Sequence, residues 1–272
     1  RRRFPAMAGG LQRLRKATSR RSVSPSEIEG RLAAARHVFD DVDLFVAPSR
    51  FMASEFERFG VAAAKIKVSD YGFVPQASAP RSPRRGPLRL GYVGTLVWHK
   101  GVHVLIDAVR TLPPGEVELR IFADLDVFPE YISDLRARAT GLAIRFEGAF
   151  DRQDVAAAYD QIDVLVVPSL WLENSPLVIH EAFMAGIPVV AARMGGIVDL
   201  VRDGENGLLY EATSTVELAN ALRSLIERPE RVAQLSARVR TARPVKTIAE
   251  DAREWTATYS ELVARRSLAL RS

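Results

Sequence analysis

The sequence contains no cysteine among its 272 residues. This absence excludes disulfide bonds and thiol catalysis, and it fits a reducing compartment. Apolar stretches are short, and none approaches the ~20 residues that are needed to span a bilayer. The N-terminal arginines are not followed by an apolar segment, so we expect no signal peptide, and because the chain begins with Arg1 we expect a piece of a longer protein. These features favour a cytoplasmic location.

Metal-binding patterns are also scarce. The four histidines are scattered, and none has a zinc-ligand spacing or lies beside a nucleophile motif. Asp124 and Asp126 form an Asp-x-Asp pair, but such pairs often occur by chance, and no third ligand lies near them in the sequence. We therefore expect no metal and no cofactor. His180 is expected to be a core residue with a hydrogen-bonded ring nitrogen, and His99 is of most interest because it precedes Lys100.

The positive charge is unevenly placed. The net charge is +5, and residues 1–22 contain arginines and a lysine but no acidic residue. Apolar residues recur among them at helical spacing, which would suit contact with a membrane surface, but Pro5 and Gly9-Gly10 disfavour a stable helix. A solvated or disordered arm is the simpler interpretation. Nucleic-acid binding is disfavoured because few aromatic residues accompany the arginines.

From Leu88 onward, strand-like and helix-like segments alternate in a chain that is 47% hydrophobic and 26% charged, as is typical of soluble globular proteins. This alternation predicts an α/β fold with a Rossmann-like, doubly wound parallel sheet. The expected strands are 88–93, 117–123, 143–147, 162–167, 187–192 and 207–210. The expected helices are 101–111, 129–139, 152–160, 176–186, 196–202, 214–227, 230–241 and 247–266.

The segment before Leu88 is too short for a complete sheet domain. It predicts a strand at 43–48, a helix at 50–60 and a second strand near 66–69. A linker rich in proline, glycine and arginine follows at 75–87. We interpret this part as the tail end of another α/β domain.

Seven residues separate Glu173 from Glu181, and a helix is predicted to begin between them. Ser175 is a favoured N-cap, and Pro176 is favoured at the first helical position. The N–H groups of Leu177 and Val178 would then be free in the first turn, which makes the helix start an anion site.

Glu181 lies four residues after Leu177 in a helix that is apolar nearly all round, so its carboxylate needs a hydrogen-bonding partner. Glu173 lies on the loop at the carboxyl end of the preceding strand, where open α/β sheets bind ligands. Either residue alone is best interpreted as a structural ion pair or a solvated side chain. Together, beside an anion-ready helix start, they indicate a binding site.

Glycines mark the loop after the first strand of this sheet. Gly94 and Gly101 bracket it, and Lys100 is expected at the start of the next helix. The helix dipole opposes a lysine there, so a bound phosphate would explain it, although an ordinary surface lysine is the alternative. The loop matches neither the dinucleotide fingerprint nor a Walker loop.

Two further glycine clusters lie at later strand and helix ends. Gly195-Gly196 would let the backbone approach a ligand closely at a helix start. The cluster from Asp203 to Gly207 is expected to be a turn that leads into the strand at Leu208-Leu209.

Together these motifs resemble the C-terminal domain of the family 4 retaining glycosyltransferases, which have the GT-B fold. The similarity rests on Glu173-x7-Glu181, Gly94-x5-Lys100-Gly101, Gly195-Gly196 and Asp203-Gly-x-Asn-Gly207. It covers about residues 42–266, and residues 43–74 resemble the last strand-helix-strand unit of that family's N-terminal domain. Each motif is weak alone, but the set is highly specific.

The resemblance implies that the chain binds a UDP-, GDP- or ADP-sugar. Glu181 would hold the ribose hydroxyls and Glu173 the donor-sugar hydroxyls, while Lys100 and the N–H groups of Leu177 and Val178 would hold the diphosphate. Glu173 and Lys100 would be the catalytic residues. Transfer would retain the anomeric configuration and would need no metal, because fixed positive groups would stabilise the leaving diphosphate. The full donor-binding set is Gly94, Thr95, Lys100, Glu173, Asn174, Ser175, Leu177, Val178 and Glu181.

The resemblance also implies a domain division and an acceptor class. Residues 1–80 would be a partial N-terminal, acceptor-side domain with a basic arm, 86–245 the nucleotide-sugar-binding domain, and 246–272 a C-terminal helix that packs back on the N-terminal side. The acceptor would be a glycan or a lipid-linked molecule, in surface polysaccharide or glycolipid synthesis, and the arm would suit work at the inner membrane face. The sugar and the base stay open.

Two departures from the family pattern leave alternatives. Thr95 stands where the family commonly has Arg, and losing such a donor typically costs about 3–4 kcal/mol of transition-state stabilisation. Either His99 substitutes for the arginine or the enzyme is slow.

The second departure is that most of the N-terminal domain is missing, so we expect donor binding with poor transfer. A binding module that kept the fold and lost activity is the second hypothesis, and an NAD-dependent enzyme is disfavoured because the fingerprint loop is lacking.

Overall fold

A parallel sheet of six strands is the centre of the structure, a computed structural model that describes residues 23–75, 86–151, 154–242 and 244–269. Its strands lie in the order β5-β4-β3-β6-β7-β8. They are β3 (Leu88–Val93), β4 (Val117–Phe122), β5 (Ile144–Gly148), β6 (Val164–Val167), β7 (Val189–Ala192) and β8 (Gly207–Tyr210). The chain therefore runs outward from β3 to β5, returns beside β3 at β6 and continues to β8. This topology confirms the predicted doubly wound α/β fold.

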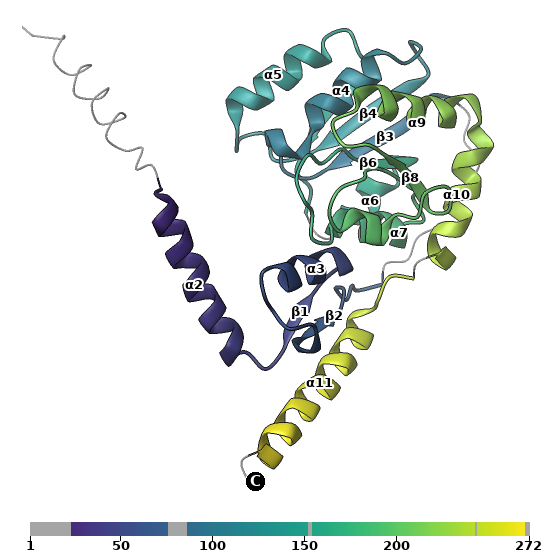
Figure 1. The fold of residues 1–272 in the computed structure, drawn as a ribbon. Helices are drawn as coiled ribbons and strands as arrows, with labels where there is room; N and C mark the ends of the chain where they lie inside the picture. The colour runs from purple at the N-terminus through teal and green to yellow at the C-terminus, as the bar shows by residue number, and fades with distance from the viewer. Residues whose placement is uncertain (1–22, 76–85, 152–153, 243, 270–272) are drawn as a thin grey trace, which may run out of the picture.

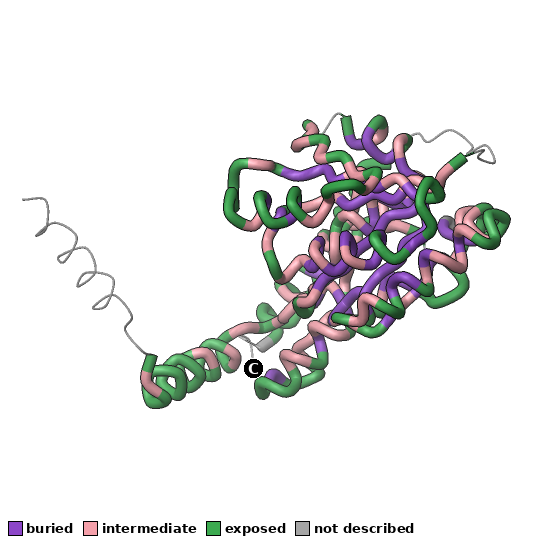
Figure 2. The backbone as a smooth tube through the Cα atoms, turned by 90° about the horizontal axis from the view of Figure 1, so that it is seen from above, coloured by how far each residue is buried: buried purple, intermediate pink, exposed green. Residues whose placement is uncertain are grey.

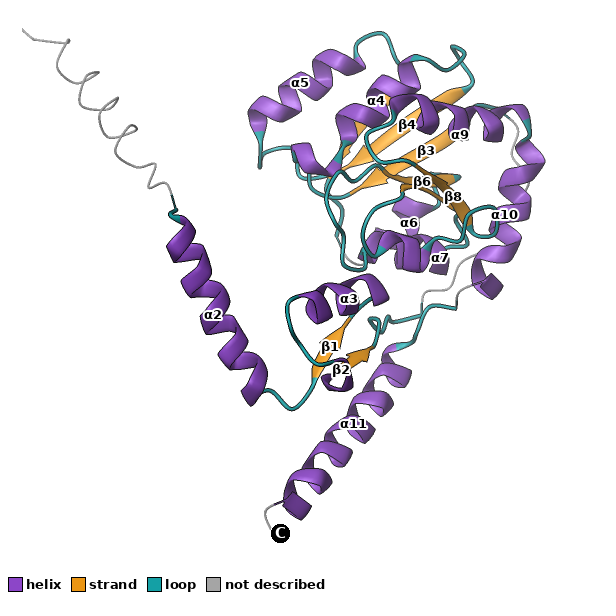
Figure 3. Cartoon of the chain, in the orientation of Figure 1, coloured by secondary structure: helices purple, strands orange, loops and turns teal. Residues whose placement is uncertain are grey.

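Helices cover both faces of this sheet, as Figures 1 and 3 show. One face carries α4 (Val102–Arg110), α5 (Pro129–Ala139) and α9 (Thr215–Glu227). The other carries α6 (Val155–Tyr159), α7 (Leu177–Met184) and α8 (Ile197–Leu200). Helix α10 (Pro229–Ala242) contributes to both, with Leu235 in the core of the first face and Val239 in the core of the second. The predicted helices are thus present, with ends that differ by a few residues.

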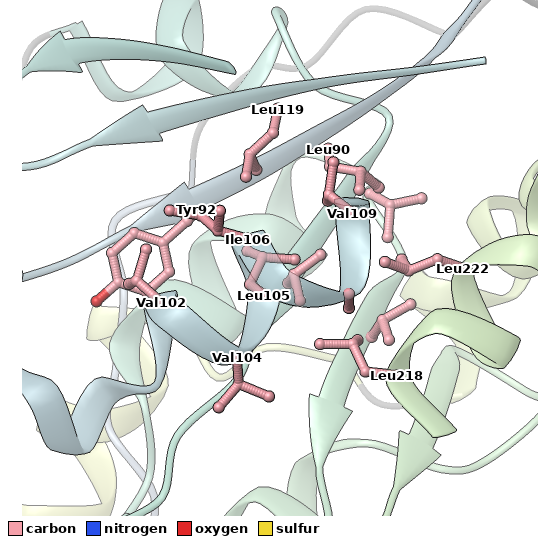
Figure 4. Packing of buried hydrophobic residues seen from close by; sticks show 14 of the residues in the cluster. Leu90, Tyr92, Val102, Val104, Leu105, Ile106, Val109, Leu119, Leu218 and Leu222 are labelled. Atoms are coloured by element: carbon pink, nitrogen blue, oxygen red, sulfur yellow. The ribbon is translucent and has the colours of Figure 1, made fainter. Parts of the chain in front are cut away.

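Each face of the sheet has its own hydrophobic core. In β6, Val164 and Val166 belong to one core and Leu165 and Val167 to the other, because side chains alternate along a strand. A strand buried on both faces is a continuous apolar run, which is why β6 was recognisable in the sequence. Figure 4 shows the first core, where α4 and α9 pack on the sheet.

A small N-terminal unit precedes the sheet. It contains α2 (Pro25–Asp41), β1 (Phe45–Ala47), α3 (Arg50–Arg58), the short helix η1 (Ala63–Lys65) and β2 (Ile66–Val68). β1 and β2 pair in parallel as a separate two-stranded sheet. The segments expected at 43–48, 50–60 and 66–69 are therefore present as β1, α3 and β2.

Helix α2 was not predicted. None of its residues is buried, as the exposed colouring of its tube in Figure 2 shows. Its start is specified locally, because the Ser24 side chain accepts the N–H of Glu27 and the Glu27 carboxylate accepts the N–H of Ser24. This reciprocal pair is a capping box.

The last helix, α11 (Ile248–Ala269), contacts the N-terminal unit. Glu254 forms ion pairs with Lys67 of β2 at 3.0 Å and with Lys246 at 3.1 Å. Phe73, which follows β2, donates its N–H to the carbonyl of Lys246 at 2.9 Å and accepts the N–H of Ile248 at 2.8 Å. Lys246 lies two residues before Ile248, the first residue of α11. The chain segments that follow β2 and precede α11 are therefore bonded to each other.

Two sequence predictions fall outside the described residues: the basic arm 1–22 and most of the linker expected at 75–87. In the part of the chain that the structure describes, no helix has both the length and the apolarity that a membrane crossing requires.

Candidate active site

A cleft of about 980 Å³ lies at the carboxyl ends of β3 and β6. Its walls are the loop after β3, the loop after β6 with the start of α7, and residues 71–74 after β2. β3 and β6 are the neighbouring strands at which the strand order reverses, the usual position of ligand sites in open α/β sheets. The cleft is lined by all the predicted donor-binding residues: Gly94, Thr95, Lys100, Glu173, Asn174, Ser175, Leu177, Val178 and Glu181.

Lys100 and Glu173 form an ion pair in this cleft. Lys100 Nζ donates to Glu173 Oε1 at 2.6 Å, and Ser169 Oγ donates to the same oxygen at 2.7 Å. The Glu173 side chain is 13% exposed and that of Lys100 is 33% exposed, so the pair is less screened than a surface pair. The interaction holds an ammonium group and a carboxylate at one end of the cleft.

Gly101 allows these two loops to meet. It follows the short helix η2 (Trp98–Lys100) and has a left-handed backbone with φ 72°. A Cβ atom at this position would also collide with the carbonyl oxygen of Pro168, on the loop after β6. Glycine satisfies both the conformation and the close approach, and it thereby permits the Lys100–Glu173 contact.

Helix α7 begins at Leu177, with Pro176 as its N-cap. The predictions of Ser175 as N-cap and Pro176 as first helical residue were therefore wrong by one residue. Ser175 does not cap the helix because its Oγ donates to Asp70 Oδ1 at 2.8 Å and lies 3.0 Å from His180 Nε2. Within the described residues, the N–H groups of Leu177 and Val178 have no acceptor. The predicted anion-ready helix start is present, one residue later than expected.

Glu181 lies in the second turn of α7 and accepts a hydrogen bond from a tyrosine. Tyr159 Oη donates to Glu181 Oε2 at 2.9 Å, and it also lies 3.1 Å from the carbonyl oxygen of Val178. Burial raises the pKa of Tyr159 well above its usual value, and the nearby Glu181 charge raises it further, so the hydroxyl stays protonated. The sequence did not single out Tyr159, because its partner is 22 residues away and no local motif records the pair.

Thr95 and His99 lie on the loop after β3. Thr95 is exposed at the cleft. The ring of His99 contacts Trp98 and Trp171, with a centroid distance of 5.7 Å in each case. His99 also lines the cleft beside Lys100. That His99 takes the role of the arginine that the family commonly has at the position of Thr95 stays a prediction.

Gly195-Gly196 approaches the protein's own backbone. Gly196 donates its N–H to the carbonyl of Glu173 at 2.6 Å, and a Cβ atom on Gly196 would collide with the carbonyl oxygen of Asn174. The close approach that we predicted for a ligand is thus made to the Glu173–Asn174 loop. The glycine pair supports the loop that presents Glu173.

The cluster from Asp203 to Gly207 is a turn into β8, as predicted. Asn206 is fully buried, and its side chain accepts the N–H of Arg202 at 2.7 Å and donates to the carbonyl of Leu200 at 3.1 Å. Its amide satisfies backbone groups at the end of α8. The cluster is therefore structural.

Two other expectations concerned polar side chains. His180 is 3% exposed and its Nε2 lies 3.0 Å from Ser175 Oγ, which confirms the prediction of a hydrogen-bonded core histidine. Asp124 Oδ1 accepts the N–H of Asp126 at 2.9 Å, a local turn. No three His, Cys, Asp or Glu side chains gather in a metal-binding arrangement in the described ranges.

Comparisons with known proteins show which enzymes this chain is similar to. The glycogen synthase of Mycobacterium tuberculosis (strain ATCC 25618 / H37Rv) is 34% identical over 210 residues, which are 74% of this chain and 49% of that protein. The D-inositol 3-phosphate glycosyltransferase of Xylanimonas cellulosilytica is 30% identical over 236 residues, 79% of this chain and 56% of that protein. The chain thus spans about half the length of the relatives that it matches.

Solved structures share the fold. The complex of Anabaena Alr3699/HepE with UDP and glucose superposes with a TM-score of 0.75 at 25% identity, covering 88% of this chain and 69% of that one. The sucrose-phosphate synthase of Thermosynechococcus elongatus gives a TM-score of 0.75 at 25% identity, covering 87% of this chain and 62% of that one. The model of the family described as glycosyl transferases group 1 matches residues 87–228. Because this match covers more than half of the chain, the protein belongs to the glycosyl transferases group 1 family.

Proposed function

We propose that this chain is the donor-binding half of a family 4 retaining glycosyltransferase, with a nucleotide sugar as its donor. One observation carries the proposal: a single cleft holds the Lys100–Glu173 ion pair, the Glu181 carboxylate and the free N–H groups at the start of α7. A nucleotide sugar presents complementary groups in one molecule, namely ribose hydroxyls, a diphosphate and sugar hydroxyls.

Each group has a partner of suitable chemistry. Carboxylates accept hydrogen bonds from hydroxyls, so Glu181 would hold the ribose and Glu173 the sugar. The N–H groups of Leu177 and Val178 would bind the diphosphate at the positive end of the helix dipole. Lys100 would add a charge, and its bond to Glu173 keeps the ammonium group beside the position expected for the sugar–phosphate bond.

In this proposal, transfer breaks the bond between the anomeric carbon and the diphosphate and forms one to the oxygen of an acceptor hydroxyl, whose proton passes to the departing diphosphate. The departing diphosphate gains negative charge, and fixed donors that are already in place stabilise it without reorganisation. Lys100 and the α7 amides are such donors, and no metal is needed for this role. Retention of configuration follows from the family resemblance and stays a proposal.

The relatives support a nucleotide-sugar donor but do not identify its nucleotide or its sugar. HepE has been crystallised with UDP and with UDP-glucose, and the matched relatives are named glycogen synthase and D-inositol 3-phosphate glycosyltransferase. We propose a UDP-, GDP- or ADP-sugar donor and a glycan or lipid-linked acceptor, in surface polysaccharide or glycolipid synthesis.

Titration calorimetry with UDP, GDP and ADP tests the donor site directly. We expect one of them to bind, and Glu181→Gln and Lys100→Met each to weaken binding, whereas Asp124→Asn on a turn outside the cleft leaves it unchanged. The proposal fails if the chain binds none of the three, or if the Asp124 control weakens binding as much as the cleft variants do.

Catalysis by this chain alone is a separate question. Without most of an acceptor-side domain, we expect donor binding with little transfer. Robust single-turnover transfer by the purified 272-residue chain would contradict this. The alternative of a non-catalytic module is favoured by Thr95, which places no charge where the family commonly has arginine. Donor binding without donor hydrolysis would support this alternative.

Contact of residues 1–22 with the inner membrane face is a further part of the proposal. The positive charge of this arm would attract anionic lipid. Flotation with anionic liposomes tests it, and equal flotation of the chain with and without residues 1–22 would exclude the contact.

A further inference from the structure

A buried polar cluster connects the N-terminal unit to the start of α7. It contains Asp70, Ser175 and His180. Ser175 Oγ donates to Asp70 Oδ1 at 2.8 Å and lies 3.0 Å from His180 Nε2, and that nitrogen lies 3.4 Å from Asp70 Oδ1. The exposed fractions of Ser175 and His180 are 6% and 3%. This cluster is separate from the Lys100–Glu173 pair and from the Tyr159–Glu181 bond.

Asp70 directly precedes residues 71–74, which form one wall of the cleft and which we name the strap. Phe73 of the strap stacks on the His180 ring, with a centroid distance of 4.8 Å and an interplanar angle of 25°. The Phe73 backbone also bonds to Lys246 and Ile248. The strap is thus fixed on one side by the segment before α11 and on the other by α7.

The carboxylate of Asp70 stays ionised in this position. Burial alone would raise its pKa, but hydrogen bonds from His180, Ser175 and the backbone of Tyr71 hold the pKa well below its usual range. A partly buried carboxylate with these donors binds Ser175 strongly, since hydrogen bonds to charged groups are stronger than those between neutral groups. Ser175 is therefore held at the cleft wall, and its hydroxyl is already occupied.

We propose that Asp70 is a positioning residue for the donor's diphosphate, which acts through Ser175 and His180 on the first-turn amides of α7. Ser175 lies two residues before Leu177, and His180 lies in the same helix, so the cluster fixes the helix start at two points. The inference rests on the proposed function, because it concerns the group that those amides bind.

The test compares a nucleoside diphosphate with its nucleoside. UDP and uridine are used if UDP binds the wild-type chain; otherwise GDP or ADP is used with the matching nucleoside. Asp70→Asn keeps the size but removes the charge. We expect it to weaken UDP binding at least fivefold and to change uridine binding less than twofold, because only the diphosphate reaches the α7 amides.

Asp199→Asn is the matched control. Asp199 Oδ2 accepts the N–H of Phe51 at 2.9 Å, so it also connects the N-terminal unit to the sheet domain, but it does not line the cleft. We expect it to leave the ratio of UDP to uridine affinity unchanged. An equal change of this ratio in both variants overturns the inference, because it shows that loss of any contact between the N-terminal unit and the sheet domain explains the effect.

Two further comparisons separate positioning from stability. His180→Gln keeps a nitrogen near the Nε2 position and should retain more UDP affinity than His180→Leu. The double variant Asp70→Asn with Ser175→Ala should be no weaker than the worse single variant, because both residues act through one contact. If Asp70→Asn weakens UDP and uridine equally, or leaves UDP unchanged while the wild type binds it, the inference fails. Failure of the wild type to bind any of the three diphosphates refutes the proposed function, and this inference with it.

Discussion

Replacing Tyr159 by Phe removes one hydroxyl and tests the role of Glu181. The ring is completely buried, so phenylalanine keeps the packing, and the change removes the 2.9 Å bond to Glu181 Oε2. A hydrogen bond to a charged group contributes about 1.5–3 kcal/mol. The lower end applies here because Glu181 lines an open cleft, where water replaces part of the lost bond. We expect the free energy of unfolding to fall by about 1–2 kcal/mol.

The same change should affect nucleotide binding selectively. If Tyr159 orients Glu181 toward the ribose, its loss should cost about 1 kcal/mol of binding free energy, which corresponds to roughly fivefold to tenfold weaker UDP binding. Binding of 2′,3′-dideoxy-UDP should change little, because it has no ribose hydroxyl for Glu181 to accept from. Calorimetry with both nucleotides measures this discrimination, and GDP or ADP pairs serve if the wild type prefers them.

Tyr210→Phe is the control for removing a buried tyrosine hydroxyl. Tyr210 is 3% exposed, and its hydroxyl has no hydrogen-bond partner among the described residues. Its removal should leave binding unchanged and stability unchanged or raised. The reasoning is refuted if Tyr159→Phe weakens UDP and the dideoxy compound equally, or if the two Phe variants behave alike.

Three further outcomes are expected. Lys100→Met should weaken UDP binding more than uridine binding, since it removes a charge near the diphosphate; equal losses in calorimetry would contradict this. Gly196→Ala should lower the free energy of unfolding by about 1–3 kcal/mol in denaturant melts, because its Cβ collides with Asn174 although its backbone conformation suits alanine; a neutral result would refute the tight loop contact. Partial burial would raise the pKa of Glu254, but hydrogen bonds from Lys67, Lys246 and Ser69 lower it to about 2. Its contribution to stability is therefore present near neutral pH and is lost as the pH falls from its usual range toward about 2, so Glu254→Gln should lower Tm at pH 7 and make little difference at pH 2.

The sequence indicated the sheet well because its inner strands β6 and β7 are buried on both faces. Apolar runs bounded by glycine or proline gave β3 and β8 with the bounds that the structure shows, and Pro129 marked the start of α5. Helix α2 was missed because no apolar face is buried along it. The signal that could have found it was Ser24 followed by Glu27, the capping box that the structure contains.

The candidate site was predictable where its residues belong to local motifs. Lys100, Glu173, Glu181 and the amides of α7 follow from loop and helix patterns at strand ends. The contacts that position them are not local: Asp70 lies 105 residues before Ser175 and displaced the expected cap, and Tyr159 reaches Glu181 across two helices. Partners of this kind depend on the tertiary fold, and no spacing rule records them.

The backbone bonds between Phe73 and the segment at Lys246 and Ile248 have a mechanical consequence. They tie the segment after β2 to the start of α11 at one point beside the cleft. The same segment contacts α7, because Phe73 stacks on His180 and Asp70 accepts a hydrogen bond from Ser175. A displacement at the start of α11 would therefore be transmitted to this wall of the cleft and to the first turn of α7.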